Sequence, residues 1–227
     1  MNDILKGKKA ALIDMDGVIY DSMKFHAEAF RRLFKEEGVP GNPEDVYLYE
    51  GMRGADLVNM LYTRAYGHGV SKERARELYE LKSKYFYEIG RNEPMVGADR
   101  MLNAIKKHDL RCVLVTGSAQ VKLLDGVNRD YPGIFLPGDR VTALDVVNGK
   151  PDPEPYLKGL AIAGVPAEEA IVIENAPLGV RAGKAAGIFT VAVTTGPIPR
   201  EAFEQEGADI IFPSMPAFAD YLESLNY

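Results

Sequence analysis

The stretch AALIDMDGVIYDS, residues 10–22, joins an apolar run to two aspartates, Asp14 and Asp16, which are followed through Gly17 by a second apolar run. A continuous apolar run of this length is typical of a strand buried on both faces of a parallel sheet. Carboxylates at the end of such a strand lie at the edge of the sheet where open α/β sheets bind their ligands. The stretch therefore predicts both a fold class and the position of a site.

Five further runs rich in apolar and β-branched residues repeat this pattern, with helical stretches between them. The alternation of strand and helix predicts an α/β layered fold built on a parallel sheet. The six predicted strands are residues 10–14, 112–116, 140–144, 170–174, 189–193 and 209–212.

The segment from about residue 22 to residue 90 interrupts this alternation, because it contains three helical patterns and no convincing strand. It is too long for a simple crossover between strands, which needs little more than its helix. We therefore predict two domains: a catalytic core formed by residues 1–20 and 91–227, and a helical cap formed by residues 21–90 and inserted after the first strand.

The composition excludes several classes of function. A formal net charge of −6 and a pI near 5.2 oppose binding to nucleic acid or to an anionic membrane surface. No apolar run approaches the 18 residues of a membrane span, and the first twenty residues do not match a secretion signal, so we expect a cytoplasmic protein with no obligate protein partner. The single cysteine, Cys112, lies within the apolar run CVLV, which indicates a buried structural thiol.

Polar residues follow four of the predicted strands. Because the carboxyl ends of parallel strands meet at one edge of the sheet, we expect these residues to converge on one site. They are Asp14 and Asp16; Thr116, Gly117 and Ser118; Lys150; and Glu174 and Asn175.

This set of residues suits phosphoryl transfer. Neighbouring carboxylates repel one another and therefore need a cation, and a donor set made only of oxygen atoms favours Mg²⁺ over zinc. Lys150 and Thr116 supply a positive charge and a hydroxyl donor for a phosphate. Asp14 can then attack phosphorus to form an acyl phosphate. Asp16 can protonate the leaving oxygen and later activate water, a role typically worth about 10²–10⁴ in rate.

The combination resembles the haloacid dehalogenase superfamily. The matching blocks are DMDGVIYD (14–21), VTGS (115–118), GKPDPEPY (149–156) and VIENAPLGVRAGKAAG (172–187). The resemblance implies a Rossmann-like core, Asp14 as nucleophile and metal ligand, and Asp16 as acid/base and main-chain metal ligand. It also implies that Thr116 and Lys150 hold the phosphate. Glu174 and Asn175 occupy the place of a metal-binding acidic pair, and Asn175 departs from that pattern because an amide binds a metal through a neutral oxygen.

Within the superfamily, the chain looks similar to the β-phosphoglucomutase-like subgroup. His26 in HAEAF and Lys82 in ELKSKYF match cap residues that reach into the active site there. The block YEGMRG, with Glu50 and Arg53, departs from the mutase pattern. The blocks KPDPEPYL, IENAPLGV and GADIIFPSM resemble the inorganic pyrophosphatases related to this subgroup more closely. The acid at Asp16 argues against cleavage of carbon–halogen bonds, since members with that activity lack it.

Glu50 has a physical rationale in a pyrophosphatase. A cap carboxylate would repel the distal phosphate of a sugar bisphosphate, whereas pyrophosphate arrives as a magnesium chelate whose metal Glu50 could bind. Lys82 and Arg53 would then face the phosphate oxygens. We therefore predict a Mg²⁺-dependent phosphohydrolase of a small phosphorylated substrate, with inorganic pyrophosphate as the leading candidate and sugar phosphates next.

Several alternatives stay open from the sequence. The chain could be a β-phosphoglucomutase or a non-catalytic phosphometabolite-binding protein. Asn175, Thr116 and Ser118 could also serve as helix caps. His26 could be a packed residue without a functional role, and Lys82 could lie on a solvated face of its helix.

Overall fold

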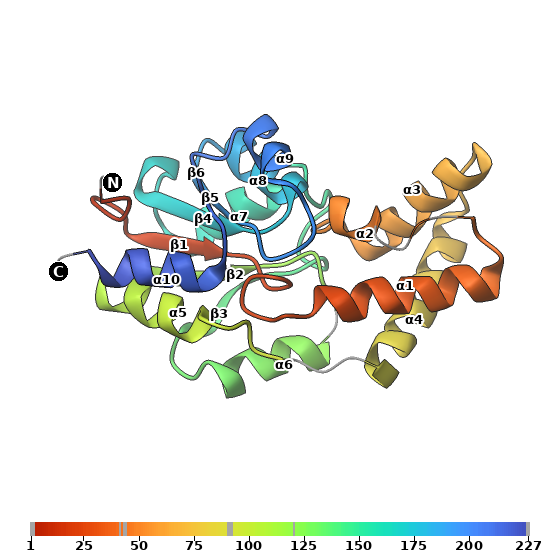
Figure 1. The fold of residues 1–227 in the computed structure, drawn as a ribbon, viewed down its shortest axis with the longest axis horizontal. Helices are drawn as coiled ribbons and strands as arrows, with labels where there is room; N and C mark the ends of the chain where they lie inside the picture. The colour runs from red at the N-terminus through yellow and green to blue at the C-terminus, as the bar shows by residue number, and fades with distance from the viewer. Residues whose placement is uncertain (1–2, 41, 43–44, 90–92, 120, 226–227) are drawn as a thin grey trace.

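The protein is described here from a computed structural model. The structure describes residues 3–40, 42, 45–89, 93–119 and 121–225. It contains a sheet with helices on both sides and a separate group of helices at one end (Figure 1). This arrangement confirms the predicted fold class, an α/β Rossmann-like core with a helical cap.

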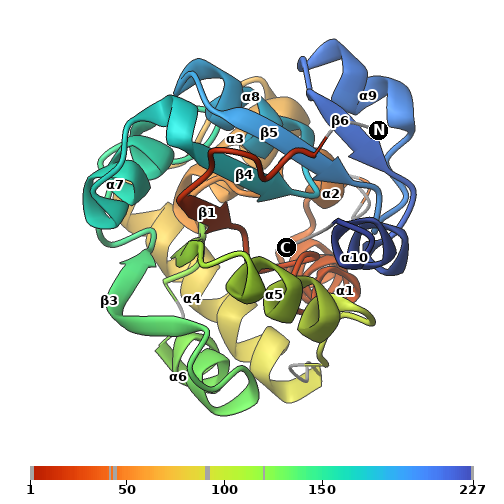
Figure 2. The same ribbon diagram turned by 90° about the vertical axis from the view of Figure 1, so that its left-hand side faces the viewer.

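The core is built on one parallel sheet of six strands in the order β3-β2-β1-β4-β5-β6. The central strand β1 lies between β2 and β4, so the segments that follow these three strands emerge side by side. Figure 2 shows β1, β4 and β5 next to one another in this order. The strands are β1 (Ala10–Ile13), β2 (Arg111–Val115), β3 (Phe135–Val141), β4 (Ala170–Glu174), β5 (Phe189–Val193) and β6 (Ile210–Phe212).

Alternate residues of each central strand face opposite layers of the core. In β1, Ala11 and Ile13 belong to the apolar cluster that includes α5 and α10, whereas Ala10 and Leu12 belong to the cluster that includes α7. All four residues are fully buried. Burial on both faces explains why the strand reads as a continuous apolar run rather than an alternating one.

The predicted bounds of the third strand are wrong. The strand is Phe135–Val141, and Thr142 already starts a turn in which its amide donates to Asp145. Pro137 and Gly138 within the strand resemble turn residues and hide it from a pattern search. Both are tolerated because β3 is an edge strand whose pairing with β2 is irregular.

Helices cover both faces of the sheet. The helices α5, α6 and α10 share a cluster with one face, and α7 and α8 pack on the other. The sequence pattern does not single out α5 and α9 as helices. The core helices are α5 (Ala98–Lys107), α6 (Val121–Asp130), α7 (Glu154–Ala163), α8 (Pro177–Ala185), α9 (Arg200–Gln205) and α10 (Met215–Glu223), with a short 3₁₀ helix η1 at Ala167–Glu169.

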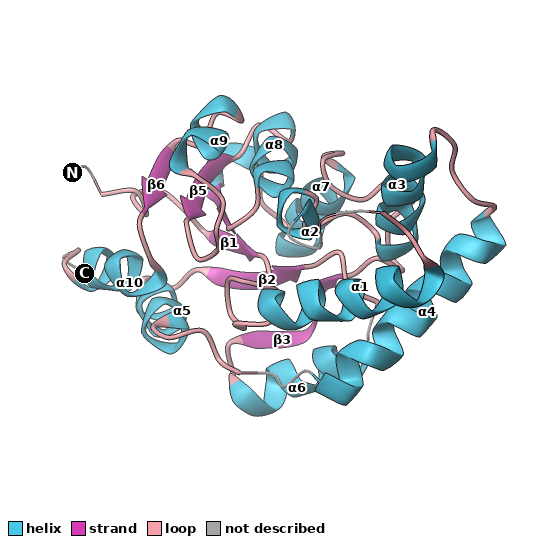
Figure 3. Ribbon diagram, turned by 45° about the vertical axis from the view of Figure 1, so that its right-hand side comes forward, coloured by secondary structure: helices cyan, strands magenta, loops and turns pink. Residues whose placement is uncertain are grey.

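The cap follows β1 and lies beyond the carboxyl ends of the strands (Figure 3). Its own apolar cluster includes Phe30 and Leu33 of α1, Leu61 of α3 and Leu78 of α4. The short helix α2 was not predicted, and the expected domain boundary between residues 90 and 91 lies outside the described residues. The cap helices are α1 (Met23–Glu37), α2 (Asp45–Leu48), α3 (Gly54–Tyr66) and α4 (Lys72–Ile89).

Among the helices that the structure describes, none is both long enough and apolar enough to cross a membrane. Cys112 is buried in β2, as its apolar surroundings in the sequence predict.

Candidate active site

The residues that follow β1, β2 and β4 meet at one edge of the sheet. The backbone amide of Asp14 donates to the carbonyl of Ile173 at 3.1 Å, which continues the pairing of β1 with β4. On the other side of β1, Ile13 is paired with Leu114 of β2. Strand pairing therefore places Asp14 between the end of β2 and the end of β4, as its position in the sequence predicts.

The ammonium of Lys150 joins all three of these strand ends. Its Nζ donates to Asp14 Oδ1 at 2.5 Å, to Glu174 Oε1 at 2.6 Å and to the carbonyl of Val115 at 3.1 Å. Burial alone would favour the neutral amine, but the two carboxylates outweigh it and raise the pKa of Lys150. Lys150 is therefore a fixed positive charge beside the predicted nucleophile.

Glu174 is fully engaged by donors of the protein itself. Its Oε1 accepts hydrogen bonds from Lys150 and from the hydroxyl of Tyr156 at 2.7 Å. Its Oε2 accepts from the backbone amides of Asn175 and Ala176 at 3.0 and 3.2 Å. Four donors fill the acceptor positions of a carboxylate. This arrangement orients Lys150 and the turn after β4, and it leaves little room for direct binding of a metal by Glu174.

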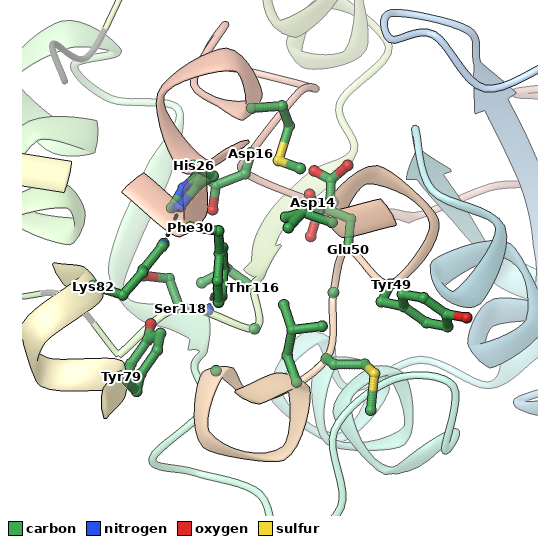
Figure 4. A pocket seen from close by; sticks show the side chains of 17 residues that line it. Asp14, Asp16, His26, Phe30, Tyr49, Glu50, Tyr79, Lys82, Thr116 and Ser118 are labelled. Atoms are coloured by element: carbon green, nitrogen blue, oxygen red, sulfur yellow. Dashed lines mark hydrogen bonds and ion pairs between the residues drawn. The ribbon is translucent and has the colours of Figure 1, made fainter. Parts of the chain in front are cut away.

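Asp16 faces the cap. Its Oδ1 accepts a hydrogen bond from Ser22 Oγ at 2.5 Å. The same oxygen lies 3.2 Å from His26 Nε2, and the other ring nitrogen of His26 lies 2.5 Å from Lys82 Nζ (Figure 4). Burial would raise the pKa of Asp16, but His26, Ser22 and Lys82 together lower it. Asp16 is therefore held as a carboxylate, the form that can accept a proton from water.

Lys82 is buried rather than solvated. Its ammonium lies 5.0 to 5.7 Å from the ring centroids of Phe30, Tyr79 and Phe86, close enough for cation–π attraction. Burial lowers its pKa to about 7, and the charge of Asp16 partly opposes that shift. Burial and the neighbouring Lys82 also lower the pKa of His26. The resemblance implies that His26 and Lys82 reach into the active site, and both side chains line the cavity that also contains Asp16. Their contact with a substrate stays a prediction.

A cavity of about 60 Å³ lies between core and cap. The core contributes Asp14, Asp16 and the Thr116-Gly117-Ser118 turn, in which Thr116 Oγ1 accepts a hydrogen bond from the amide of Ser118 at 3.0 Å. Ligand pockets for drug-sized molecules are typically several hundred Å³. With these dimensions the cavity suits a very small ligand. Its cap wall includes Phe30, Glu50, Leu57, Tyr79 and Lys82.

Glu50 reaches from the cap to the core. Both of its carboxylate oxygens accept hydrogen bonds from Asn175 Nδ2, at 3.2 and 3.1 Å. Burial raises the pKa of Glu50 well above its usual value, and the carboxylates of Asp14, Glu174 and Asp16 raise it further. The site therefore brings several carboxylates together, and a bound cation would reduce the repulsion between them.

The donors present fit a magnesium ion. Asn175 Oδ1 is buried and lacks a hydrogen-bond partner among the described residues, which is the condition expected of an oxygen that binds a metal. Asp14 and Glu50 add carboxylate oxygens, the donors that Mg²⁺ prefers. No group of three or more His, Cys, Asp or Glu side chains within the described ranges is placed to hold a metal. The candidate set instead mixes carboxylates with an amide and, as the resemblance implies, the carbonyl of Asp16.

Arg53 does not line the cavity. Its guanidinium donates to the carbonyl of Val147 in the core, and its Nε lies 3.6 Å from Asp56 Oδ2. The expectation that Arg53 faces the phosphate oxygens therefore does not match this arrangement.

Ser22 and Tyr156 were missed as site residues. Each supports a predicted residue through one hydrogen bond, Ser22 to Asp16 and Tyr156 to Glu174. Tyr156 lies within the block GKPDPEPY, so its motif was recognised without its contact. Ser22 follows DMDGVIYD directly, and a hydroxyl placed just before a predicted helix was the available signal.

Comparison with known proteins identifies the family. A family model described as haloacid dehalogenase-like hydrolase matches residues 8–187. The chain belongs to the haloacid dehalogenase-like hydrolases. This assignment agrees with the resemblance of its four sequence blocks and makes the chain a phosphatase- or phosphoglucomutase-like enzyme.

Three relatives illustrate where this haloacid dehalogenase-like hydrolase lies within the family. A solved structure from Bacteroides vulgatus, provisionally described as a β-phosphoglucomutase, is 45% identical with a TM-score of 0.90, covering 95% of this chain and 88% of that one. Hexitol phosphatase A of Escherichia coli (strain K12) is 29% identical over 209 residues, 91% of each chain. The β-phosphoglucomutase of Bacillus subtilis (strain 168) is 27% identical, covering 83% of this chain and 84% of that one.

Proposed function

We propose that the protein is a Mg²⁺-dependent phosphohydrolase that acts through an aspartyl-phosphate intermediate, with inorganic pyrophosphate as its favoured substrate. The observation that carries the substrate proposal is the position of Glu50. This cap carboxylate is buried in the site and hydrogen-bonded to Asn175, among the carboxylates of the core.

The first step forms a bond between a carboxylate oxygen of Asp14 and phosphorus and breaks the bond from phosphorus to the leaving oxygen. Lys150 partly neutralises Asp14, which reduces a repulsion between carboxylate and phosphate of roughly 1 kcal/mol per unit pair at 4 Å in water and about four times more near a protein surface. The Thr116-Gly117-Ser118 turn presents a hydroxyl and backbone amides to the transferred group. A bound Mg²⁺, held by Asp14, the carbonyl of Asp16 and Asn175, would supply further charge neutralisation. Glu50 would bind a metal only when that metal arrives as the chelate of pyrophosphate.

The second step hydrolyses the intermediate. Asp16 takes a proton from water, the water oxygen bonds to phosphorus, and the bond from phosphorus to Asp14 breaks, releasing phosphate and restoring the carboxylate. The proton on Asp16 is then available for the leaving oxygen of the next turnover. His26 and Ser22 hold Asp16 in place for this exchange.

Two features favour pyrophosphate, the first over a sugar bisphosphate and the second over any phosphorylated sugar. A carboxylate at Glu50 would repel the distal phosphate of a sugar bisphosphate, but it can bind the metal of a magnesium–pyrophosphate chelate. The small cavity also favours a compact substrate.

Hydrolysis of a sugar or polyol phosphate is the second candidate. Its support comes from relatives, since Hexitol phosphatase A of Escherichia coli and "Phosphorylated carbohydrates phosphatase" of Thermotoga maritima are similar to most of this chain. Phosphoglucomutase activity is a third candidate, supported by the relative in Bacillus subtilis. Incubation with β-glucose 1-phosphate and a trace of the bisphosphate separates the last two, because a mutase forms glucose 6-phosphate without releasing phosphate.

The decisive experiment compares phosphate release from pyrophosphate and from p-nitrophenyl phosphate, with magnesium and with chelator. The variants are Glu50→Ala, Asp14→Asn and Glu80→Ala, the last being a control at an exposed carboxylate of the cap. We expect Glu50→Ala to lower kcat/KM for pyrophosphate by about 100-fold, equivalent to about 2.7 kcal/mol, and to change the aryl phosphate by less than threefold. Glu80→Ala should match the wild type on both.

Each part of the proposal can fail separately. An equal loss on both substrates in Glu50→Ala would remove pyrophosphate as the favoured substrate and leave the phosphatase assignment standing. Full activity of Asp14→Asn, or full activity in chelator, would overturn the mechanism. A trapped acyl phosphate, or release of phosphate that needs magnesium, would exclude a non-catalytic binding protein.

A further inference from the structure

The turn formed by residues 50–53 is tied to the core at both ends. At one end, Glu50 accepts hydrogen bonds from Asn175, 125 positions away. At the other end, the guanidinium of Arg53 donates to the carbonyl of Val147, 94 positions away. Both contacts cross from cap to core, so the turn that carries Glu50 is bound to two separate core segments.

The core loop that receives Arg53 is held in place. The carboxylate of Glu154 accepts hydrogen bonds from two backbone amides. The amide of Val147 lies 3.0 Å from Oε1, and the amide of Asn148 lies 2.8 Å from Oε2. The amides of Asn148 and Val147, together with Lys158, lower the pKa of Glu154 to about 2, so this acceptor stays ionised at any ordinary pH. The carbonyl of Val147 is therefore a fixed acceptor rather than part of a loose loop.

The backbone of Arg53 is also packed closely on the core. A Cβ atom added at Gly149 would lie 2.9 Å from the backbone nitrogen of Arg53 and 2.8 Å from its Cγ. A Cβ atom added at Gly117 would lie 2.6 Å from the carbonyl oxygen of Gly51 in the same turn. These approaches are closer than real Cβ contacts, so the turn fits the core only because glycine occupies both positions.

We propose that Arg53 is a positioning residue that latches the closed cap onto the Val147 loop and so holds Glu50 in the cavity. In this role Arg53 does not touch the substrate. Its guanidinium makes a charge-assisted hydrogen bond to a carbonyl that is available only when the cap is closed. The inference rests on the proposed function for its kinetic readout, whereas its structural readout needs no substrate.

The test uses Arg53→Met, which keeps the aliphatic part of the side chain and removes the donor, and Arg53→Lys, which keeps the charge. Arg76→Met is the matched control, because Arg76 is an exposed arginine of the cap. The first readout is amide hydrogen exchange of the ligand-free protein. We expect exchange to increase at least tenfold in segments 50–53 and 146–149 of Arg53→Met, with no change at residues 209–212, and a smaller increase in Arg53→Lys.

The second readout is steady-state kinetics with pyrophosphate and p-nitrophenyl phosphate in the presence of magnesium. If Arg53 acts through closure of the cap, Arg53→Met should raise KM for both substrates by a similar factor of about ten, with less change in kcat. Arg76→Met should leave KM and hydrogen exchange unchanged.

Three results would overturn the proposal. Unchanged exchange in segments 50–53 and 146–149 would mean that the contact with Val147 does not hold the cap. A rise in KM confined to pyrophosphate would mean that Arg53 affects Glu50 or that substrate alone and does not hold the whole cap closed. Faster exchange with unchanged KM on both substrates would mean that closure does not position the site. If pyrophosphate is not a substrate at all, the exchange experiment and the aryl phosphate still decide the role of Arg53.

Discussion

The side-chain amide of Asn175 lies within 3.2 Å of both carboxylate oxygens of Glu50, across the boundary between core and cap. The resemblance to the family leads one to expect an acid at position 175, and an acid there would repel Glu50. The amide instead donates to the cap carboxylate, and its own buried oxygen has no hydrogen-bond partner among the described residues. The negative charge that the core lacks at position 175 is thus supplied by the cap.

Asn175→Asp tests whether the carboxylate of Glu50 takes the place of an acid at position 175. Without metal, the new carboxylate would lie buried beside Glu50, so we expect the free energy of unfolding to fall by about 1–3 kcal/mol in EDTA. With saturating Mg²⁺ the loss should shrink, because an aspartate is a stronger metal ligand than an amide. Urea denaturation in EDTA and in magnesium measures both effects, with Asn103→Asp on the exposed face of α5 as control. An equal loss in the two buffers would show that the site does not hold the metal.

Lys150→Met should destabilise the fold as well as abolish activity. The ammonium is almost fully buried and is bonded to Asp14 and Glu174, so its removal leaves two buried carboxylates without a positive partner. Loss of one partner from such a network typically costs about 3–5 kcal/mol. Urea denaturation in EDTA should show this loss, whereas Lys84→Met at an exposed position of α4 should stay within about 0.5 kcal/mol of the wild type. A loss below 1 kcal/mol for Lys150→Met would contradict the network.

Lys82 should make stability depend on pH. Burial lowers its pKa in the folded protein to about 7 from an ordinary value of 10.5. Between these values the unfolded chain holds a proton that the folded chain has released, so stability rises with pH. The cost of burying the charge is fully present below pH 7 and is relieved as the pH rises above it.

The comparison variant is Lys82→Met, which fills the same aromatic surroundings without a titrating group. Above pH 7, the free energy of unfolding should rise with pH more steeply in the wild type than in Lys82→Met. The difference between the two should grow by up to about 1.4 kcal/mol per pH unit. Denaturation at pH 6, 7, 8 and 9 measures the difference, and Lys84→Met at an exposed position of α4 is the control. Parallel curves for wild type and Lys82→Met would show that Lys82 is not held in a low-pKa state.

Cys112 should resist alkylation in the native protein. Burial in β2 raises the pKa of its thiol to about 12, so at pH 8 very little thiolate is present and access is closed. Iodoacetamide at pH 8 should modify the protein only after addition of denaturant, as mass spectrometry would report. Rapid labelling of the folded protein would contradict the buried position of this residue.

The sheet and its site were predictable because the two use the same signal. Parallel strands buried on both faces appear as apolar runs, and the polar residue after each run lies at the ligand-binding edge. Asp14, Thr116 and Glu174 could be placed in this way without any knowledge of tertiary structure. The bounds of β3 were predicted wrongly, because an edge strand tolerates a Pro-Gly pair that a central strand would exclude.

The cap residues were harder to place, because their roles depend on how two domains meet. Nothing in the block YEGMRG distinguishes an arginine that faces the substrate from one that bonds to a carbonyl 94 residues away. Lys82 has charged neighbours in the sequence, yet its own side chain is buried among aromatic rings. The charges of neighbouring residues predict which face of a single helix is exposed to solvent. They carry no information about which other part of the protein packs against that helix.

The close approach of Gly51 to Gly117 bears on any redesign of the enzyme. At this point the cap and the core meet through main-chain atoms. No side chain there can be shortened, so no substitution would enlarge the cavity at this contact. A variant intended for bulkier phosphate esters would have to lose volume elsewhere in the wall, at Leu57 or Tyr79, which line the cavity from the cap.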